Sequence, residues 1–165
     1  MATCAVEILL ARPDTEVIVV PVGGGSGAAG ACVVATAVRL SVQVIGVQSE
    51  AAPAAYRSWQ AGTLVEDTTS TFAEGLATRT AFELPQRILR QRLDDFVLVP
   101  EDALKAATRL MIEKTRNLVE PAGAAALAAV LAAPQRFAGR KVAIICSGGN
   151  ISPAQLAELW PGEPG

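Results

Sequence analysis

The sequence contains no histidine, and its three cysteines are too far apart to form a CxxC pair. Histidine is the commonest general base, and zinc sites usually combine histidines with paired cysteines. The composition therefore argues against a zinc site and against a histidine-assisted nucleophile. Cys4, Cys32 and Cys146 each stand among apolar neighbours. We expect them to be small buried side chains in a reducing compartment.

An excess of one charge and long apolar runs are also missing. The chain has 14 Lys and Arg against 16 Asp and Glu, and its basic residues form no run, so we expect no nucleic-acid partner. No stretch of about 18 apolar residues is free of charge, glycine or proline, so we expect no membrane span. The first residues lack the layout of a secretory signal, and we expect a cytoplasmic protein.

The chain does have a high apolar content, with 51% hydrophobic and 18% charged residues. A chain of 165 residues is long enough for one domain with a buried core. We expect residues 1–160 to form a single α/β domain. Residues 161–165, which are rich in proline and glycine, are expected to form a frayed tail.

Short β-branched runs alternate with longer helical segments along the chain. Four runs are typical of buried strands: 17–21, 42–47, 95–99 and 141–146. Four segments predict helices: 2–11, 26–40, 101–118 and 122–133. This order predicts an α/β fold with an open, mostly parallel sheet of about four strands and helices on both faces. Because the first helix has no strand before it, we expect the domain to be incomplete.

A glycine-rich segment after the first predicted strand is a candidate binding site. Residues 19–30 read VVPVGGGSGAAG, so a buried strand ends in glycines and a helix then begins. Glycines allow positive φ and a close approach of the backbone to a ligand. The N–H groups at the start of a helix favour an anion. The segment predicts a phosphate-binding loop, with a turn that holds no ligand as the alternative.

This loop is compatible with more than one phosphate-containing ligand. Gly25, Gly27 and Gly30 satisfy the G-x-G-x-x-G pattern of dinucleotide-binding folds. Glu50 follows the second predicted strand, about 20 residues further on, and suits the acid that binds a ribose in such folds. The pattern is short and easily met by chance, so a second motif is needed to choose between ligands.

The second motif follows the last predicted strand, where residues 147–150 read SGGN. Ligands of open α/β sheets bind at the carboxyl ends of the strands, so this loop and the glycine loop should face the same ligand. A compact ligand with two polar ends suits two such loops. Pyridoxal phosphate (PLP) has that shape, with a phosphate at one end and a pyridine nitrogen at the other.

Four motifs in this order resemble the serine/threonine dehydratases and serine racemases, which are fold type II PLP-dependent enzymes. The motifs are VVPVGGGSGAAG at 19–30, TFAEGLA at 71–77, LVEPAGA at 118–124 and SGGN at 147–150. The resemblance extends over about residues 3–159 and corresponds to the carboxy-terminal portion of such an enzyme. It implies PLP as the cofactor. For the parent enzyme it implies ammonia-lyase-type β-elimination of a small hydroxy amino acid.

The resemblance also implies roles for single residues. Backbone N–H groups of the glycine loop would bind the cofactor phosphate, at Gly23, Gly24, Gly25, Ser26 and Gly27. Ser26 stands where the family more often has a fourth glycine, and a backbone donor survives that change. Ser147 matches the residue whose hydroxyl bonds the pyridine nitrogen. Glu120 matches an acid near the cofactor ring, although its place before Pro121 also suits a helix start.

Two features of the family are not found in the sequence. The Schiff-base lysine of these enzymes lies upstream, and we expect Lys105, Lys114 and Lys141 to be surface charges. Without that lysine we expect no catalytic residue in the chain and no activity of the chain alone. Gln48 and Ala54 stand where some relatives carry metal-binding acids, so we expect no metal site.

Three alternative functions remain open. The chain is a phosphate- or PLP-binding module without turnover, a dinucleotide-binding domain, or a folded remnant that self-associates. An incomplete sheet leaves apolar surface and a strand edge uncovered, and a second copy can cover both. We therefore expect a homo-oligomer whose other partner is a small-molecule cofactor or phosphate.

Overall fold

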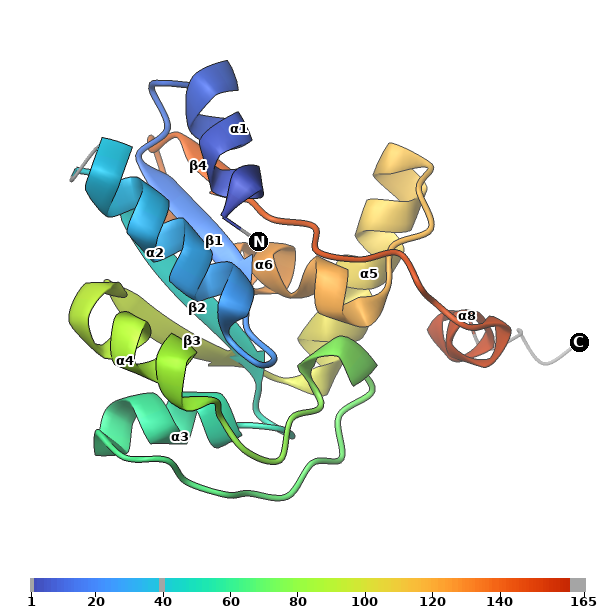
Figure 1. Cartoon of the computed structure of the whole chain (residues 1–165). Helices are drawn as coiled ribbons and strands as arrows, with labels where there is room; N and C mark the ends of the chain where they lie inside the picture. Colours follow the sequence, from blue (N-terminus) through green and yellow to red (C-terminus); the bar gives the residue numbers. More distant parts are fainter. Residues whose placement is uncertain (1, 39–40, 161–165) are drawn as a thin grey trace, which may run out of the picture.

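The structure is a computed structural model that describes residues 2–38 and 41–160 (Figure 1). The frayed tail predicted at residues 161–165 lies outside the described residues, as does the end of the helix predicted at 26–40. No helix in the described ranges combines the length and apolar character needed to cross a membrane.

Within the described residues, four parallel strands form one open sheet in the order β3-β2-β1-β4. The strands are β1 (Val17–Pro21), β2 (Gln43–Ser49), β3 (Asp95–Val99) and β4 (Val142–Ile144). Val17 pairs with Gln43 on one side and with Val142 on the other, so β1 is an interior strand. All five residues of β1 are buried, as its β-branched run predicts. The predicted fold class is confirmed.

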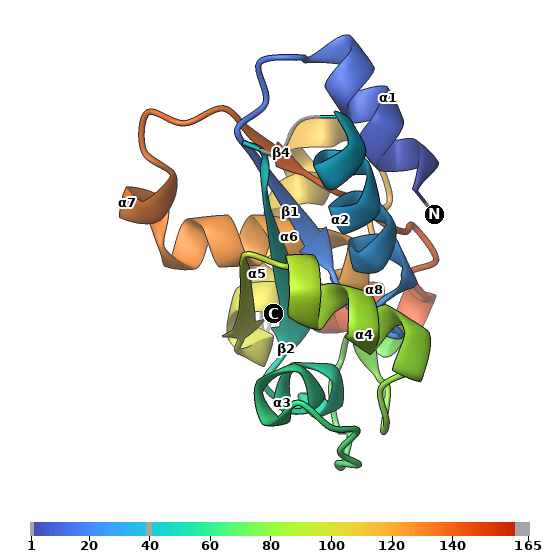
Figure 2. The ribbon, with the colours of Figure 1, turned by 60° about the vertical axis from the view of Figure 1, so that its left-hand side comes forward.

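Helices cover both faces of the sheet. The helices of the described residues are α1 (Thr3–Ala11), α2 (Ser26–Val38), α3 (Ala54–Ala61), α4 (Glu83–Arg92), α5 (Glu101–Thr115), α6 (Pro121–Ala132), α7 (Pro134–Phe137) and α8 (Pro153–Leu159), with a 3-10 turn, η1 (Glu74–Leu76). Of these, α8 packs on α5 rather than on the sheet. Figure 2 shows α1, α2 and α4 on one side of the sheet and α5 and α6 on the other. Four of these helices were predicted within a few residues. The helix expected to reach residue 118 ends at Thr115, because Arg116 is left-handed with a φ of 61°.

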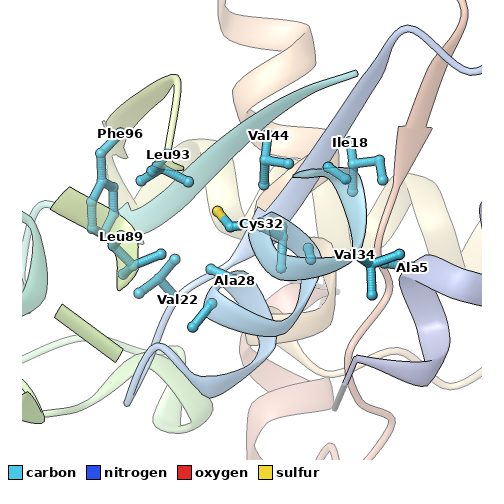
Figure 3. Close-up of a cluster of buried hydrophobic side chains, with 14 of the residues drawn as sticks. Ala5, Ile18, Val22, Ala28, Cys32, Val34, Val44, Leu89, Leu93 and Phe96 are labelled. Atoms are coloured by element: carbon cyan, nitrogen blue, oxygen red, sulfur yellow. The ribbon is translucent and has the colours of Figure 1, made fainter. Parts of the chain in front are cut away.

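Alternate side chains of β1 enter two separate cores. Ile18 and Val20 pack with α1, α2 and α4, whereas Val17 and Val19 pack with α5 and α6. This alternation is the period-2 pattern of a strand between two helical layers. Figure 3 shows the first core, in which Cys32 of α2 lies among apolar side chains. Small residues, mostly alanine, let α2 and α6 approach the sheet closely.

The expectation that all three cysteines are buried was right for Cys32 and wrong for the other two. Cys4 and Cys146 are exposed. Cys4 lies in the first turn of α1, and Cys146 follows the end of β4. Both positions border the carboxyl end of the sheet, where a cavity opens.

Candidate functional site

The glycine loop connects β1 to α2 at the carboxyl edge of the sheet. The N–H of Val22 donates to the carbonyl oxygen of Val47 at 2.7 Å, so pairing with β2 continues to the base of the loop. Gly25 has a φ of 87°, which side chains rarely allow. α2 begins at Ser26, and the N–H groups of its first turn have no acceptor within the helix. This geometry suits an anion.

The loop forms one wall of a cavity of about 380 Å³, which is within the range of about 300–1,000 Å³ for small-molecule sites. A second part of the lining comes from Cys146 and Ser147 after β4, and further parts come from η1 and from Cys4. Six of the seven predicted site residues therefore line one cavity: Gly23, Gly24, Gly25, Ser26, Gly27 and Ser147. Sequence analysis missed Gly75 and Leu76 of η1 as lining residues, although the TFAEGLA motif contains both.

The residues of this cavity fit PLP. A Cβ at Gly23 would stand 2.4 Å from the carbonyl oxygen of Gly75, and a Cβ at Gly24 would stand 2.8 Å from the ring of Phe82. Glycine is therefore required at Gly23, where the contact is with backbone, whereas at Gly24 the contact is with a side chain that can move. A backbone without side chains at these positions leaves its amide groups accessible to an anion. Ser147 is exposed and offers a neutral hydroxyl. Backbone amides suit a phosphate, and a neutral hydroxyl suits a pyridine nitrogen.

Glu120 lines a second, smaller cavity of about 280 Å³, together with Glu74 and Gln155. Its Oε2 accepts the N–H of Asn150 at 3.0 Å, and its own N–H donates to the carbonyl oxygen of Gly148 at 3.2 Å. A Cβ at Gly148 would stand 2.2 Å from Glu120 Oε1, so the carboxylate packs directly against that glycine. In this structure Glu120 supports the 147–150 loop and does not line the first cavity.

The three lysines lie elsewhere in the described part of the chain. Lys105 Nζ is 3.2 Å from Glu158 Oε2 and lies over the ring of Phe72. Lys141 Nζ is 2.6 Å from Asp14 Oδ2, and this contact, with help from Arg12, lowers the pKa of Asp14 to about 2. Lys114 is exposed in the last turn of α5.

The residues of the dinucleotide pattern do not meet at one site. Gly25 and Gly27 line the first cavity, but Gly30 lines a separate apolar groove beside α4, and Glu50 is exposed after β2. The G-x-G-x-x-G match therefore carries less weight than the pairing of the glycine loop with Ser147.

The position considered for a metal-binding acid has a structural role. Gln48 is fully buried, and its Oε1 accepts the N–H of Tyr56 in the first turn of α3 at 3.0 Å. Ala54 is also buried, at the start of that helix. Within residues 2–38 and 41–160, no group of three or more His, Cys, Asp or Glu side chains is placed to hold a metal ion.

Comparison with known proteins identifies the family. The family model described as "Pyridoxal-phosphate dependent enzyme" matches residues 1–148. The chain belongs to this family. It is 39% identical to the L-threonine ammonia-lyase of Geobacter sulfurreducens, over 90% of this chain and 37% of that protein. It is 34% identical to the catabolic L-threonine dehydratase TdcB of Escherichia coli, over 95% of this chain and 49% of that protein.

Solved structures give the same result. The serine racemase of Dictyostelium discoideum matches with a TM-score of 0.84 and 32% identity, over 92% of this chain and 49% of that one. Threonine deaminase isoform 2 of Solanum lycopersicum, in its processed form, matches with a TM-score of 0.91 and 27% identity, over 97% of this chain and 45% of that one. These matches confirm the predicted family, its fold type II architecture and PLP as its cofactor. The chain spans about half the length, or less, of these relatives.

Proposed function

We propose that this chain is the cofactor-binding half of a PLP-dependent ammonia-lyase that acts on threonine, serine or a similar hydroxy amino acid. The observation that carries the proposal is the single cavity shared by the glycine loop and Ser147. The similarity to a threonine ammonia-lyase and a threonine dehydratase supports the reaction class. The domain organisation follows: residues 1–160 form one α/β unit that needs further chain to complete the enzyme.

Each part of the site has a separate task in this proposal. The N–H groups from Gly23 to Gly27 bind the cofactor phosphate, since they lie at a helix start where an anion is stabilised. Ser147 donates its hydroxyl to the pyridine nitrogen, which a neutral partner leaves largely unprotonated. PLP, when bound, supplies the electron sink for elimination. Glu120 fixes the loop that carries Ser147, because it accepts the N–H of Asn150 and packs on Gly148.

We propose that the chain by itself binds PLP without turnover. Covalent catalysis of this kind needs a lysine beside the cofactor, and Lys105, Lys114 and Lys141 all lie away from the cavity. No residue of this chain is therefore proposed as catalytic, and none is proposed as a metal ligand. The second half of the enzyme would supply the lysine and the substrate-binding groups.

A titration of the purified chain with PLP tests this proposal. We expect saturable binding that inorganic phosphate competes with, and no 2-oxobutanoate or pyruvate from threonine or serine. The Gly24→Asp variant places a carboxylate in the anion-binding loop, so it should not bind PLP. Binding of NAD in preference to PLP would refute the cofactor assignment. Formation of a 2-oxo acid that depends on PLP and exceeds the Gly24→Asp control would refute the inactivity.

We further propose that the chain is cytoplasmic and forms a homo-oligomer. β4 is a three-residue edge strand, and its Ile144 is 37% exposed. Leu10 of α1 and Leu84 of α4 are 77% and 58% exposed. A two-fold partner can cover such surface and the open edge together. Light scattering over a dilution series tests this: a monodisperse monomer at every concentration would refute self-association.

A further inference from the structure

One carboxylate outside the cofactor cavity joins three segments of the fold. Glu101 is the first residue of α5, directly after β3 and Pro100. Its Oε1 accepts the hydroxyls of Ser49 at 2.5 Å and of Thr71 at 2.7 Å. Its Oε2 accepts the backbone N–H of Phe72 at 2.6 Å. Glu101 thus ties the end of β2 and the start of α5 to the segment 71–76.

The segment 71–76 leads from Glu101 to the wall of the cofactor cavity. The Thr71 hydroxyl accepts the N–H of Ala73 at 3.1 Å, and the N–H of Leu76 donates to the carbonyl oxygen of Ala73 at 2.8 Å. Ala73 and Leu76 are buried, and Gly75 and Leu76 line the cavity. A short hydrogen-bonded path therefore connects the carboxylate to the cavity wall.

The far end of this segment is closely packed on two sides. The carbonyl oxygen of Gly75 fills the space beside Gly23, as described above. On its other side, a Cβ at Gly75 would stand 2.7 Å from the Cβ of Ala122 and 3.2 Å from Glu120 Oε1. Gly75 has no free space on either side. A shift of Thr71 and Phe72 that is passed along the segment must therefore move Gly75 and its neighbours in the cavity wall.

We propose that Glu101 is a positioning residue of the cofactor site. It holds the segment 71–76 so that Gly75 and Leu76 form a wall of the cavity, which we assign to the cofactor ring, and Glu101 does this without lining the cavity itself. This proposal rests on the PLP site proposed above. The phosphate is bound by the amides of the glycine loop, so loss of Glu101 should weaken contacts with the ring and spare contacts with the phosphate.

Asp102 provides a matched control. Both acids lie in the first turn of α5, where a negative charge stabilises a helix. Asp102 is exposed, whereas Glu101 holds the segment 71–76. Glu101→Gln keeps the size of the side chain but replaces one of its two acceptor oxygens by an N–H₂ group. The variant therefore loses either the acceptor for Phe72 or the acceptor shared by Ser49 and Thr71, and the bonds that remain are no longer made to a charged group. Asp102→Asn removes the same charge and leaves these bonds in place.

The experiment compares the wild-type chain, Glu101→Gln and Asp102→Asn in titrations with PLP and with inorganic phosphate. For Glu101→Gln we expect PLP binding to weaken about tenfold and phosphate binding to stay within about twofold, the factor of ten being about 1.4 kcal/mol. Asp102→Asn should match the wild type. PLP affinity of Glu101→Gln within twofold of the wild type would overturn the proposal. So would equal losses for both ligands, or the same loss in Asp102→Asn.

Amide hydrogen exchange separates this proposal from the proposed function. The N–H of Phe72 should exchange at least tenfold faster in Glu101→Gln and at an unchanged rate in Asp102→Asn. If the wild type binds no PLP, the proposed function fails. If the N–H of Phe72 exchanges at the same rate in Glu101→Gln as in the wild type, Glu101 does not hold the segment 71–76, whether or not PLP binds. If Glu101→Gln does not fold, Thr71→Val removes one of the bonds to Glu101, together with the bond from the N–H of Ala73, without changing charge. It should weaken PLP binding about threefold, and an unchanged affinity would refute the proposal.

Discussion

The carbonyl oxygen of Gly75 lies where a side chain of Gly23 would have to be, 2.4 Å from the position of its Cβ. Two segments more than fifty positions apart in the sequence are therefore in backbone contact at the cavity wall. Neither backbone can move toward the other, which makes Gly23 a position where even a methyl group is too large.

Gly23→Ala should destabilise the fold by about 1–3 kcal/mol, the usual cost of forcing an extra group into a packed site. Gly24→Ala is the matched control, because its Cβ would meet only the ring of Phe82, which is 55% exposed and free to rotate away. Urea denaturation with linear extrapolation measures the free energy of unfolding of both variants. Equal stabilities of the two variants would contradict the close contact between Gly23 and Gly75.

Ser147→Ala should weaken PLP binding by about threefold to tenfold, which corresponds to one neutral hydrogen bond of about 0.5–1.5 kcal/mol. Binding of inorganic phosphate should not change, since the hydroxyl is assigned to the other end of the cofactor. Ser26→Gly is the control, because it keeps the backbone donor of the loop. Calorimetric titration measures the PLP and phosphate affinities of the wild type, Ser147→Ala and Ser26→Gly. A loss of affinity in Ser26→Gly as large as that in Ser147→Ala would contradict the assigned roles.

The cysteines should differ in reactivity, because Cys4 and Cys146 line the cavity and Cys32 is 1% exposed in the core. In the native protein at neutral pH, iodoacetamide should modify the first two and leave Cys32 intact until the chain unfolds. PLP should slow the modification of both exposed thiols, and peptide mass spectrometry reads each site separately. Rates that do not respond to PLP would mean that the cofactor binds elsewhere.

Burial raises the pKa of the Cys32 thiol to about 12, and the nearby charge of Asp94 adds to this effect. The unfolded chain loses this proton near pH 9, whereas the folded chain keeps it, so the contribution of Cys32 to stability is complete below that pH. Stability should then fall as the pH rises from about 9 toward 12, by up to about 1.4 kcal/mol per pH unit. The difference in the free energy of unfolding between the wild type and Cys32→Ala isolates this effect. If the free energies of unfolding of the wild type and Cys32→Ala changed equally with pH between 9 and 12, the raised pKa of Cys32 would be contradicted.

The strands could be predicted from the sequence because each is a short β-branched run, and burial between two helical layers permits only apolar residues there. The helix α4 was missed. Its sequence, ELPQRILRQR, is largely polar and has a proline in the first turn. What fixes it is Leu89, which is fully buried in the first core, and Trp59 Nε1, which donates to the carbonyl oxygen of Leu89 at 3.2 Å. Both contacts are tertiary.

The candidate site could also be predicted only where the signal is local in the sequence. The glycine loop could be predicted because its geometry depends on neighbouring residues. Ser147 could be predicted because its SGGN motif follows a strand. Glu120 could be matched to a family residue by its position. Its contacts with Asn150 and Gly148 could not be predicted from the sequence. Glu101 was missed because an acid at a helix start is common without any partner. Its partners Phe72 and Ser49 lie 29 and 52 residues away in the chain, so only the folded sheet brings them to it.

The pairing of β1 with β4 has a consequence for the order of folding. The glycine loop follows β1, and Ser147 follows β4, so these two parts of the cavity are about 120 positions apart in the sequence. During synthesis the loop emerges long before the strand that completes the cavity. Contacts between such distant segments form slowly, because the intervening chain must be ordered before they are gained. A cofactor that needs both segments would therefore bind only after β4 has joined the sheet, and would then hold the two distant segments together.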